Sequence, residues 1–311
     1  MALSILEMVL PVLLMFLLGW LCNKKKIISP EGLKGIKTLV GNVLLAVVLF
    51  NAFFTAEYSG KIALTFGVVY ASCALGLGLG FLLRRLVKPY GRFMPFLVTN
   101  FEGGMMGYAL FGLLYAGQTH IFAMADIGQT LAAYTVFLVT LQAVSRGEAD
   151  VKGAVKSAAT NPALIGAFLG VILGAMGVGR AVLSSAVGGV ISKTIAFISA
   201  PVSGLILVIV GYELSFRKEL MKPVLITVGL RIAVTAVLLA VDWLIIFGTG
   251  LIPFEKPLFV ALMLAWSLPA PFIIPLYADL GKDGEYISTT LSMETIVSIL
   301  LFIGIAAYSL A

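Results

Sequence analysis

Long apolar runs separated by short polar loops dominate the chain. The hydropathy pattern distinguishes ten of them, and an α-helix needs about 20 apolar residues to cross the hydrocarbon core of a bilayer. Their approximate bounds are residues 3–22, 36–54, 62–83, 93–116, 118–143, 161–178, 195–213, 223–247, 257–279 and 286–310. The pattern predicts an all-α polytopic membrane protein with ten spanning helices. We expect the first segment to be a span rather than a signal peptide.

The fourth and ninth segments are interrupted by residues that disfavour a continuous helix. Segment nine contains Leu268-Pro269-Ala270-Pro271-Phe272-Ile273-Ile274-Pro275, and each proline removes a backbone donor and clashes with the preceding turn. Segment four contains Asn100-Phe101-Glu102-Gly103-Gly104-Met105-Met106-Gly107, in which the glycines weaken the helix. Interrupted segments in corresponding positions of two halves are typical of a transporter binding site. The structural alternative is a packed helix with a proline kink.

Composition agrees with the hydropathy pattern. The chain has 60% hydrophobic and 12% charged residues and a mean hydropathy of +1.09. These values are typical of a polytopic membrane protein and leave no stretch for a soluble domain. The net charge of +6 does not indicate nucleic-acid binding, because the basic residues lie in short loops between spans.

The distribution of basic residues between alternate loops predicts the orientation in the membrane. The odd-numbered loops hold sixteen lysines and arginines and the even-numbered loops hold four. Basic loops stay on the cytoplasmic side. We therefore expect a multi-pass protein of the cell membrane with both termini outside. The sixteen are Lys24, Lys25, Lys26, Lys34, Lys37, Arg84, Arg85, Lys88, Arg92, Arg146, Lys152, Lys156, Arg217, Lys218, Lys222 and Lys282; the four are Lys61, Arg180, Lys193 and Lys256.

Ten spans with a basic connection after the fifth suggest two five-helix halves. These would be residues 1–143 and 161–311, joined by a cytoplasmic loop at 144–160. The first half starts outside and the second inside, so a repeat would be inverted. A proline and a glycine eight residues apart open both halves, at Pro11 and Gly19 and at Pro162 and Gly170.

Several stretches resemble the auxin efflux carrier family over essentially the whole chain. They are Leu18-Gly19-Trp20-Leu21, Lys26-Ile27-Ile28-Ser29-Pro30-Glu31-Gly32-Leu33, Asn161-Pro162-Ala163-Leu164, Arg231 after the basic seventh loop, and the break at residues 268–271. The resemblance implies an inverted five-plus-five fold, like that of bile-acid/sodium symporters and sodium/proton antiporters, in which helices four and nine cross near their breaks. It also implies export or exchange of organic anions such as carboxylates or auxin-like acids.

The chain departs from the family pattern in three places. Span two lacks the expected proline near residues 45–48, and Tyr108 follows Gly107 where proline is usual. Glu102 and Glu294 stand where small or neutral residues would be ordinary. These departures leave the substrate and any coupling ion open.

An ionisable side chain inside a membrane span costs free energy, so such residues are candidates for a functional role. Asp126 and Glu294 each lie about eight residues into the last helix of a half, roughly 12 Å along its axis. Helical spacing places them beside polar side chains, which are Gln129 and Thr130 for the first and Thr290 and Ser298 for the second. Such groups could coordinate a sodium ion or hold a protonated acid. The alternative is a buried neutral carboxyl with a structural role.

Two other ionisable residues in the predicted spans each have a structural and a functional interpretation. Asp242 is either a hydrated helix end or a functional acid. Arg231 either snorkels or pairs with a carboxylate, or binds an anion.

The sequence favours a secondary transporter, and not an enzyme, that moves a small organic anion by alternating access. We expect no cofactor and no metal site, with H⁺ or Na⁺ as coupling ion, proton ahead of sodium. The bilayer is the expected partner, and a homodimer is left open. Predicted solute-binding residues are Asn100, Glu102, Gly103, Gly104, Pro269 and Pro271; predicted ion-coupling residues are Glu102, Asp126, Gln129, Thr130, Thr290, Glu294 and Ser298.

Three alternatives remain. The first is an ion-coupled carrier of a different solute on the same fold. The second is an intramembrane enzyme that uses Glu102 and Asp126 as acid and base. A passive channel is less favoured, because one chain supplies no ring of like charges.

Overall fold

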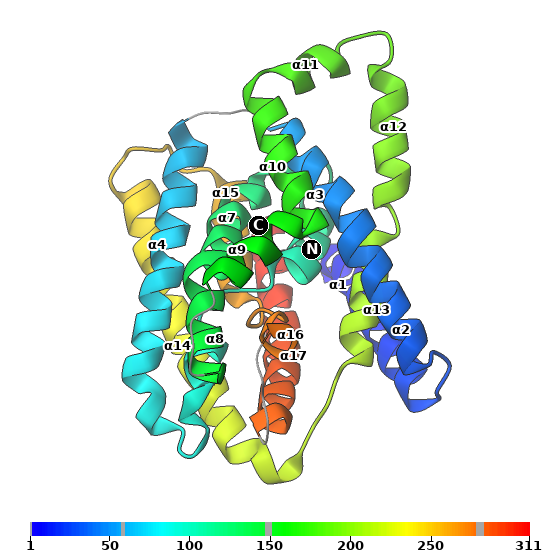
Figure 1. Cartoon of the computed structure of the whole chain (residues 1–311). Helices are drawn as coiled ribbons and strands as arrows, with labels where there is room; N and C mark the ends of the chain where they lie inside the picture. Colours follow the sequence, from blue (N-terminus) through cyan, green and yellow to red (C-terminus); the bar gives the residue numbers. More distant parts are fainter. Residues whose placement is uncertain (1, 57–59, 147–150, 278–282) are drawn as a thin grey trace.

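The computed structural model describes residues 2–56, 60–146, 151–277 and 283–311, and every regular element in these ranges is helical (Figure 1). Lys282 and residues 147–150 of the predicted connecting loop lie outside them. Six helical stretches in the described residues are long and apolar enough to cross a membrane, and shorter apolar helices accompany them. The all-helical, polytopic class predicted from hydropathy therefore agrees with the structure.

The predicted first half, residues 1–143, begins with α1 and ends inside α8. Its second segment starts at Pro30, where the Ser29 side chain accepts a hydrogen bond from the Gly32 amide and caps the helix. The elements are α1 (Ala2–Lys24), α2 (Pro30–Leu39), η1 (Val40–Leu44), α3 (Leu45–Phe54), α4 (Gly60–Leu83), η2 (Arg84–Leu86), η3 (Tyr90–Arg92), α5 (Met94–Leu97), η4 (Gly103–Gly107), α6 (Tyr108–Leu114), α7 (Thr119–Ala132), η5 (Ala133–Phe137) and α8 (Leu138–Arg146). Span two, which lacks its expected proline, contains the π-helical turn η1 instead.

The predicted second half follows α9, a helix inside the predicted connecting loop. Its first long helix starts at Pro162, where the Asn161 side chain accepts bonds from the amides of Ala163 and Leu164. The elements are α9 (Val151–Thr160), α10 (Pro162–Ala175), α11 (Val178–Leu183), α12 (Gly188–Ser199), α13 (Val202–Tyr212), η6 (Lys218–Leu220), α14 (Met221–Trp243), η7 (Leu244–Gly248), α15 (Lys256–Ser267), α16 (Ile274–Tyr277) and α17 (Gly284–Leu310).

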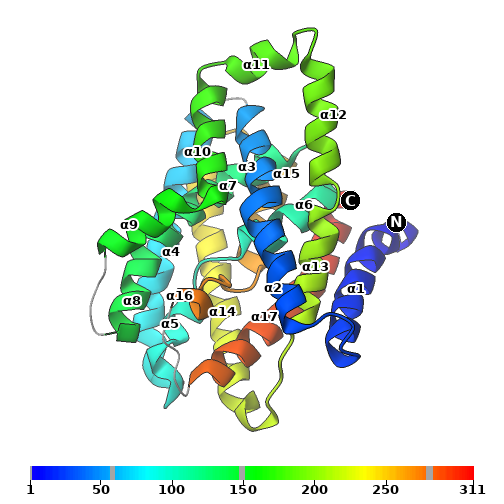
Figure 2. The same cartoon turned by 45° about the vertical axis from the view of Figure 1, so that its right-hand side comes forward.

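Glycines lie at contacts between helices of the two predicted halves. Helix α1 contacts α13, and α10 contacts α3 (Figure 2). A Cβ on Gly19 of α1 would lie 2.1 Å from the Val208 carbonyl oxygen, and one on Gly170 of α10 would lie 2.5 Å from that of Phe50. Both helix pairs approach so closely that only glycine fits at these two positions.

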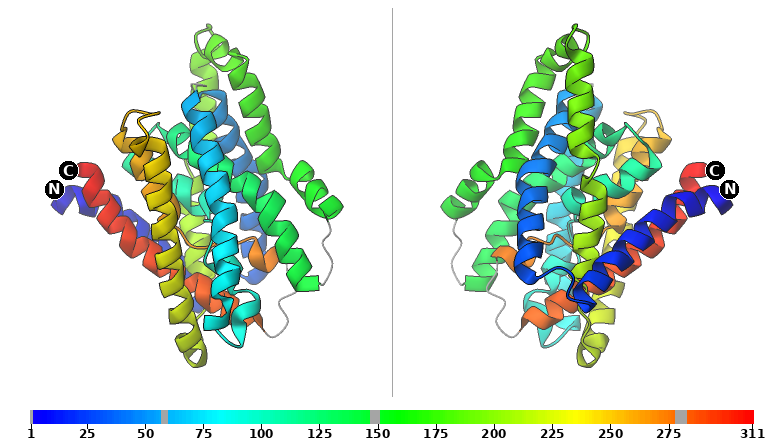
Figure 3. Two further views of the ribbon diagram at one scale, coloured as in Figure 1. Left: turned by 90° about the vertical axis from the view of Figure 1, so that its left-hand side faces the viewer. Right: turned by 90° about the vertical axis from the view of Figure 1, so that its right-hand side faces the viewer.

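Ion pairs join the two halves at opposite ends of the bundle. Lys37 of α2 pairs with Glu213 at 2.5 Å, and Lys61 of α4 pairs with Glu255 at 2.5 Å. The ends of α1 and α17 that carry the two termini lie on the same side of the molecule (Figure 3). A chain that crosses the membrane an even number of times has both termini on the same side.

Candidate functional site

Both predicted helix breaks are present, and one of them is displaced. Helix α15 ends at Ser267 and helical structure resumes at Ile274, so the prolines interrupt span nine as predicted. In span four, α5 ends at Leu97 and the next turn begins at Gly103. The break therefore precedes Gly103 and Gly104, which open the π-helical turn η4 rather than forming the gap.

The two break segments are hydrogen-bonded to each other. The Glu102 amide donates to the Pro269 carbonyl at 2.9 Å. The Phe272 amide donates back to the Glu102 carboxylate oxygen Oε2 at 2.6 Å. Glu102 thus joins the break of the first half to that of the second through both its main chain and its side chain.

Arg231 satisfies carbonyl groups that the breaks leave without helical partners. It extends from α14 and is 4% exposed. Its Nε and Nη2 donate to the Leu268 carbonyl at 3.2 and 2.6 Å. Its Nη1 donates to the carbonyls of Leu97 and Thr99 at 2.9 and 3.2 Å, and its Nη2 to that of Asn100 at 2.7 Å. Buried carbonyls require such partners, and the buried guanidinium excludes snorkelling.

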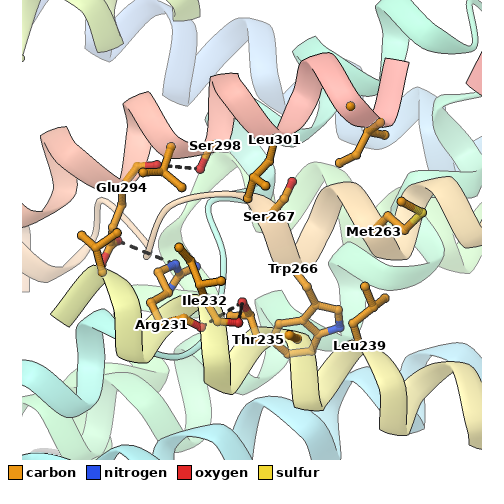
Figure 4. A pocket seen from close by; sticks show the side chains of 15 residues that line it. Arg231, Ile232, Thr235, Leu239, Met263, Trp266, Ser267, Glu294, Ser298 and Leu301 are labelled. Atoms are coloured by element: carbon orange, nitrogen blue, oxygen red, sulfur yellow. Dashed lines mark hydrogen bonds and ion pairs between the residues drawn. The ribbon is translucent and has the colours of Figure 1, made fainter. Parts of the chain in front are cut away.

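The amides freed in span nine are held by carboxylates. Pro269 and Pro271 have no N–H, so Ala270 and Phe272 supply the amides of residues 269–272. The Ala270 amide donates to Glu294 Oε2 at 2.9 Å. The same Glu294 oxygen lies 3.8 Å from Arg231 Nε, and Figure 4 shows the two side chains directed toward each other. The Arg231 guanidinium therefore binds free carbonyls of the breaks, and the carboxylates of Glu102 and Glu294 bind the free amides.

Asp126 lies against the break of the first half, as Glu294 does in the second. A Cβ on Gly103 would be 1.9 Å from Asp126 Oδ1, so this carboxyl occupies the space beside the glycine. Asp126 and Glu294 are 3% and 2% exposed. Each acid thus packs on the break of its own half.

Two buried polar atoms around the breaks, Asn100 Nδ2 and Glu294 Oε1, make no hydrogen bond in the described part of the chain. Such atoms are uncommon in native proteins. The buried Tyr108 hydroxyl and the Asp126 carboxyl interact with each other beside them. The set holds an amide donor, a hydroxyl and two carboxyl oxygens, which is the chemistry needed to bind a polar solute or a cation.

A comparison with protein families gives a match over residues 4–151, to the family model described as membrane transport protein. The match confirms the resemblance to the auxin efflux carrier family over these residues. The match covers the predicted first half and reaches the start of α9. The family indicates a membrane transporter. A comparison with curated proteins found no match.

The remaining predicted coupling residues bond mainly within their own helices. The hydroxyls of Thr290 and Ser298 donate to the carbonyls of Tyr286 and Glu294 at 2.7 and 2.8 Å. The Thr130 hydroxyl lies 3.4 Å from Gln129 Oε1. These contacts leave hydroxyl lone pairs free to accept or to coordinate. Thr130 and Ser298 also line cavities, with Asp126 and Glu294 respectively.

Two cavities lie beside the break of span nine, apart from the one of 250 Å³ that Asp126 and Thr130 line. One of 350 Å³ is lined by Arg231, Trp266, Glu294 and Ser298 (Figure 4). The other, of 540 Å³, is more polar and lies against the break of span nine and α17. Its lining includes Lys37, Glu213, Ser215, Phe272, Ser288 and Ser292. The Lys37–Glu213 pair places this second cavity toward the predicted cytoplasmic end.

Asp242 does not lie at a hydrated helix end, which was one of the two interpretations that the sequence allowed. It is fully buried, and its two oxygens accept bonds from the Ser72 hydroxyl at 2.5 Å and the Trp266 ring N–H at 2.7 Å. It joins α4, α14 and α15.

The sequence analysis did not identify Thr99, whose carbonyl accepts a hydrogen bond from Arg231. No sequence pattern marks a residue that acts through its main chain.

Proposed function

We propose that this protein is a secondary transporter that moves a small organic anion, such as a carboxylate or an auxin-like acid, by alternating access around the two crossed breaks. The observation that carries the proposal is the contact between the breaks. Glu102 bonds to Pro269 and Phe272, and Arg231 bonds to carbonyls of both break segments. A site made jointly by two halves changes shape when the halves move relative to each other.

An inverted repeat of five plus five helices is part of the proposal. Three pairs of observations support it. Helix α1 packs on α13 as α10 packs on α3, Gly19 and Gly170 mediate the two contacts, and Asp126 and Glu294 each contact the break of their own half. The ten predicted spans then form two equivalent halves that exchange roles when access alternates.

The charges at the site favour coupling to a cation. Glu102, Asp126 and Glu294 are buried, and Arg231 is the basic side chain buried with them among the described residues. Two like charges ~4 Å apart repel by about 4 kcal/mol at an effective dielectric constant of 20. An anionic solute adds a further negative charge, so a proton or a sodium ion must enter with it or be held already. We favour the proton, because carboxyls outnumber carbonyl cages suited to sodium.

Counterflow tests transport directly. Purified protein is reconstituted in liposomes loaded with unlabelled indole-3-acetate, and labelled indole-3-acetate is added outside. A carrier accumulates label transiently and returns it chemically unchanged. Acetate and succinate, run the same way, test the alternative that another solute is carried. Chemical conversion of the label would favour the intramembrane enzyme, and failure of all three acids to exchange would overturn the organic-anion proposal.

A further inference from the structure

A cavity between α14, α15 and α17 lies at the outer surface of the helix bundle. Its volume of 350 Å³ falls in the range of about 300–1,000 Å³ that is typical of small-molecule sites. Ile232 and Leu301, which are exposed, form part of its apolar wall near the middle of α14 and α17 (Figure 4). The middle of a spanning helix lies in the hydrocarbon core of the bilayer. A molecule dissolved in the membrane can therefore reach this cavity.

The inner wall of the cavity is polar and carries no net charge. The buried side chains of Arg231 and Glu294 line it, and their opposite charges lie 3.8 Å apart. The hydroxyls of Thr235, Ser267 and Ser298 line it as well. A further charge at this depth would have no counter-charge and would cost free energy. The inner wall therefore favours an uncharged polar group.

The hydrogens that the guanidinium and the three hydroxyls can donate are already used. Arg231 makes five hydrogen bonds to main-chain carbonyls, and a guanidinium has five N–H donors. Each hydroxyl donates to a carbonyl three or four residues earlier in its own helix. Glu294 Oε2 accepts from the Ala270 amide, whereas Oε1 is buried without a hydrogen-bond partner among the described residues. The cavity therefore offers acceptors and lacks a donor.

We propose that this cavity binds an uncharged lipid of the membrane whose head is a free hydroxyl. The hydroxyl donates to Glu294 Oε1, and the apolar chain lies against Ile232 and Leu301. The hydrogen bond satisfies a buried acceptor that the protein itself leaves unpaired. Because Glu294 also holds the Ala270 amide, the bound lipid contacts the group that supports the break of span nine. The inference concerns a second ligand and does not depend on the transported solute.

Quenching of Trp266 fluorescence tests this proposal, because Trp266 lines the cavity. The chain has two other tryptophans, so Trp20→Phe and Trp243→Phe together make a reporter protein whose emission comes from Trp266. The reporter protein in phosphatidylcholine liposomes is titrated with 8-bromo-1-octanol, whose bromine quenches tryptophan on contact. The methyl ether of the same alcohol is the matched probe, since it has an acceptor but no donor. A third probe, 8-bromooctylamine, carries a cationic head.

We expect the alcohol to reach half-maximal quenching at a membrane concentration about tenfold lower than the ether, because only the alcohol can donate to a buried carboxylate. Gly304→Leu in the reporter protein should remove this difference by filling the cavity. Gly304 lines the cavity, and a Cβ there would have no atom within 4 Å. Gly229→Leu is the matched control, because its Cβ is equally free and Gly229 lies on α14 outside the cavity lining. It should leave the difference unchanged.

Equal quenching by alcohol and ether in the reporter protein would overturn the proposal, since partition into an apolar groove would explain it. Stronger quenching by the amine than by the alcohol would contradict the uncharged class. Absence of quenching by every probe would also contradict the proposal and would indicate a groove covered by another molecule, such as a second copy of the chain. Should Gly304→Leu fail to fold, the comparison of alcohol with ether decides alone. None of these readouts requires transport, so the proposed function stands or fails separately.

Discussion

At the scale of single residues, buried side chains at the site supply the hydrogen bonds that the broken helices lack. A helix that is broken inside a bilayer exposes carbonyls and amides that no water satisfies. Arg231 donates hydrogen bonds to the carbonyls of Leu97, Thr99, Asn100 and Leu268. The carboxylates of Glu102 and Glu294 accept hydrogen bonds from the amides of residues 272 and 270. Few side chains therefore maintain both breaks, and their removal should have large effects.

Arg231→Gln should destabilise the fold strongly. Removing one member of a buried charged network costs roughly 3–5 kcal/mol, because the remaining partners stay buried and unpaired. Thermal unfolding in detergent measures the effect. Arg217→Gln, which breaks the exposed pair with Glu285, should change stability by about 1 kcal/mol or less. Equal unfolding temperatures for the Arg231 variant and wild type would contradict the role given to Arg231.

Asp126→Asn and Glu294→Gln should separate coupling from exchange. Each carboxyl lies on the break of its own predicted half and is almost fully buried. Without these acids, we expect gradient-driven accumulation of indole-3-acetate to be lost while counterflow persists. Accumulation is measured in liposomes under imposed proton or sodium gradients. Variants that accumulate the acid with wild-type ion dependence would show that the acids are structural.

At the scale of elements, the sequence predicted the ninth break better than the fourth. Proline removes its own N–H and excludes the helical geometry around it, so Pro269 and Pro271 locate their break directly. Glycine only permits a break. In span four the helix ends at Leu97, before Gly103. Asn100 in the gap has a left-handed φ of 52°, and its carbonyl accepts a hydrogen bond from Arg231. That partner is 131 residues away, and local sequence does not encode such a contact.

Helix contacts between the halves give an element-scale prediction. Gly19→Ala and Gly170→Ala place a Cβ 2.1 and 2.5 Å from carbonyl oxygens of the partner helix, so each should cost about 1–3 kcal/mol by overpacking. Gly78→Ala in α4 is the matched control, because a Cβ there has no atom within 4 Å. Thermal unfolding should separate the pair from the control. Tolerance of alanine at both glycines would mean that α1 and α10 do not pack as described.

At the scale of the whole molecule, loop charge predicts an orientation that the fold alone does not set. Both termini lie on one side of the bundle (Figure 3), and the sixteen-to-four asymmetry of basic residues assigns that side to the exterior. The structure offers two reporter positions. Gln118 after α6 and Lys156 in α9 are exposed and lie in loops predicted to face opposite sides.

Single-cysteine variants at these positions decide the orientation. In a background without Cys22 and Cys73, which are buried free thiols, an impermeant maleimide should label Gln118→Cys in intact cells. It should label Lys156→Cys only after the cells are opened. The reverse pattern would place both termini in the cytoplasm.

The most direct test of the central claim asks whether solute occupies the crossing of the breaks. Gly104→Cys is suited to it, because the position is half-buried and its Cβ would meet no atom closer than 3.5 Å. Gly78→Cys, also without neighbours, is the control. The rate of alkylation by a small permeant reagent is measured in liposomes with and without saturating indole-3-acetate. Our account predicts slower alkylation at position 104 and no change at 78. An unchanged rate at 104, in liposomes that exchange the acid by counterflow, would place the solute site elsewhere.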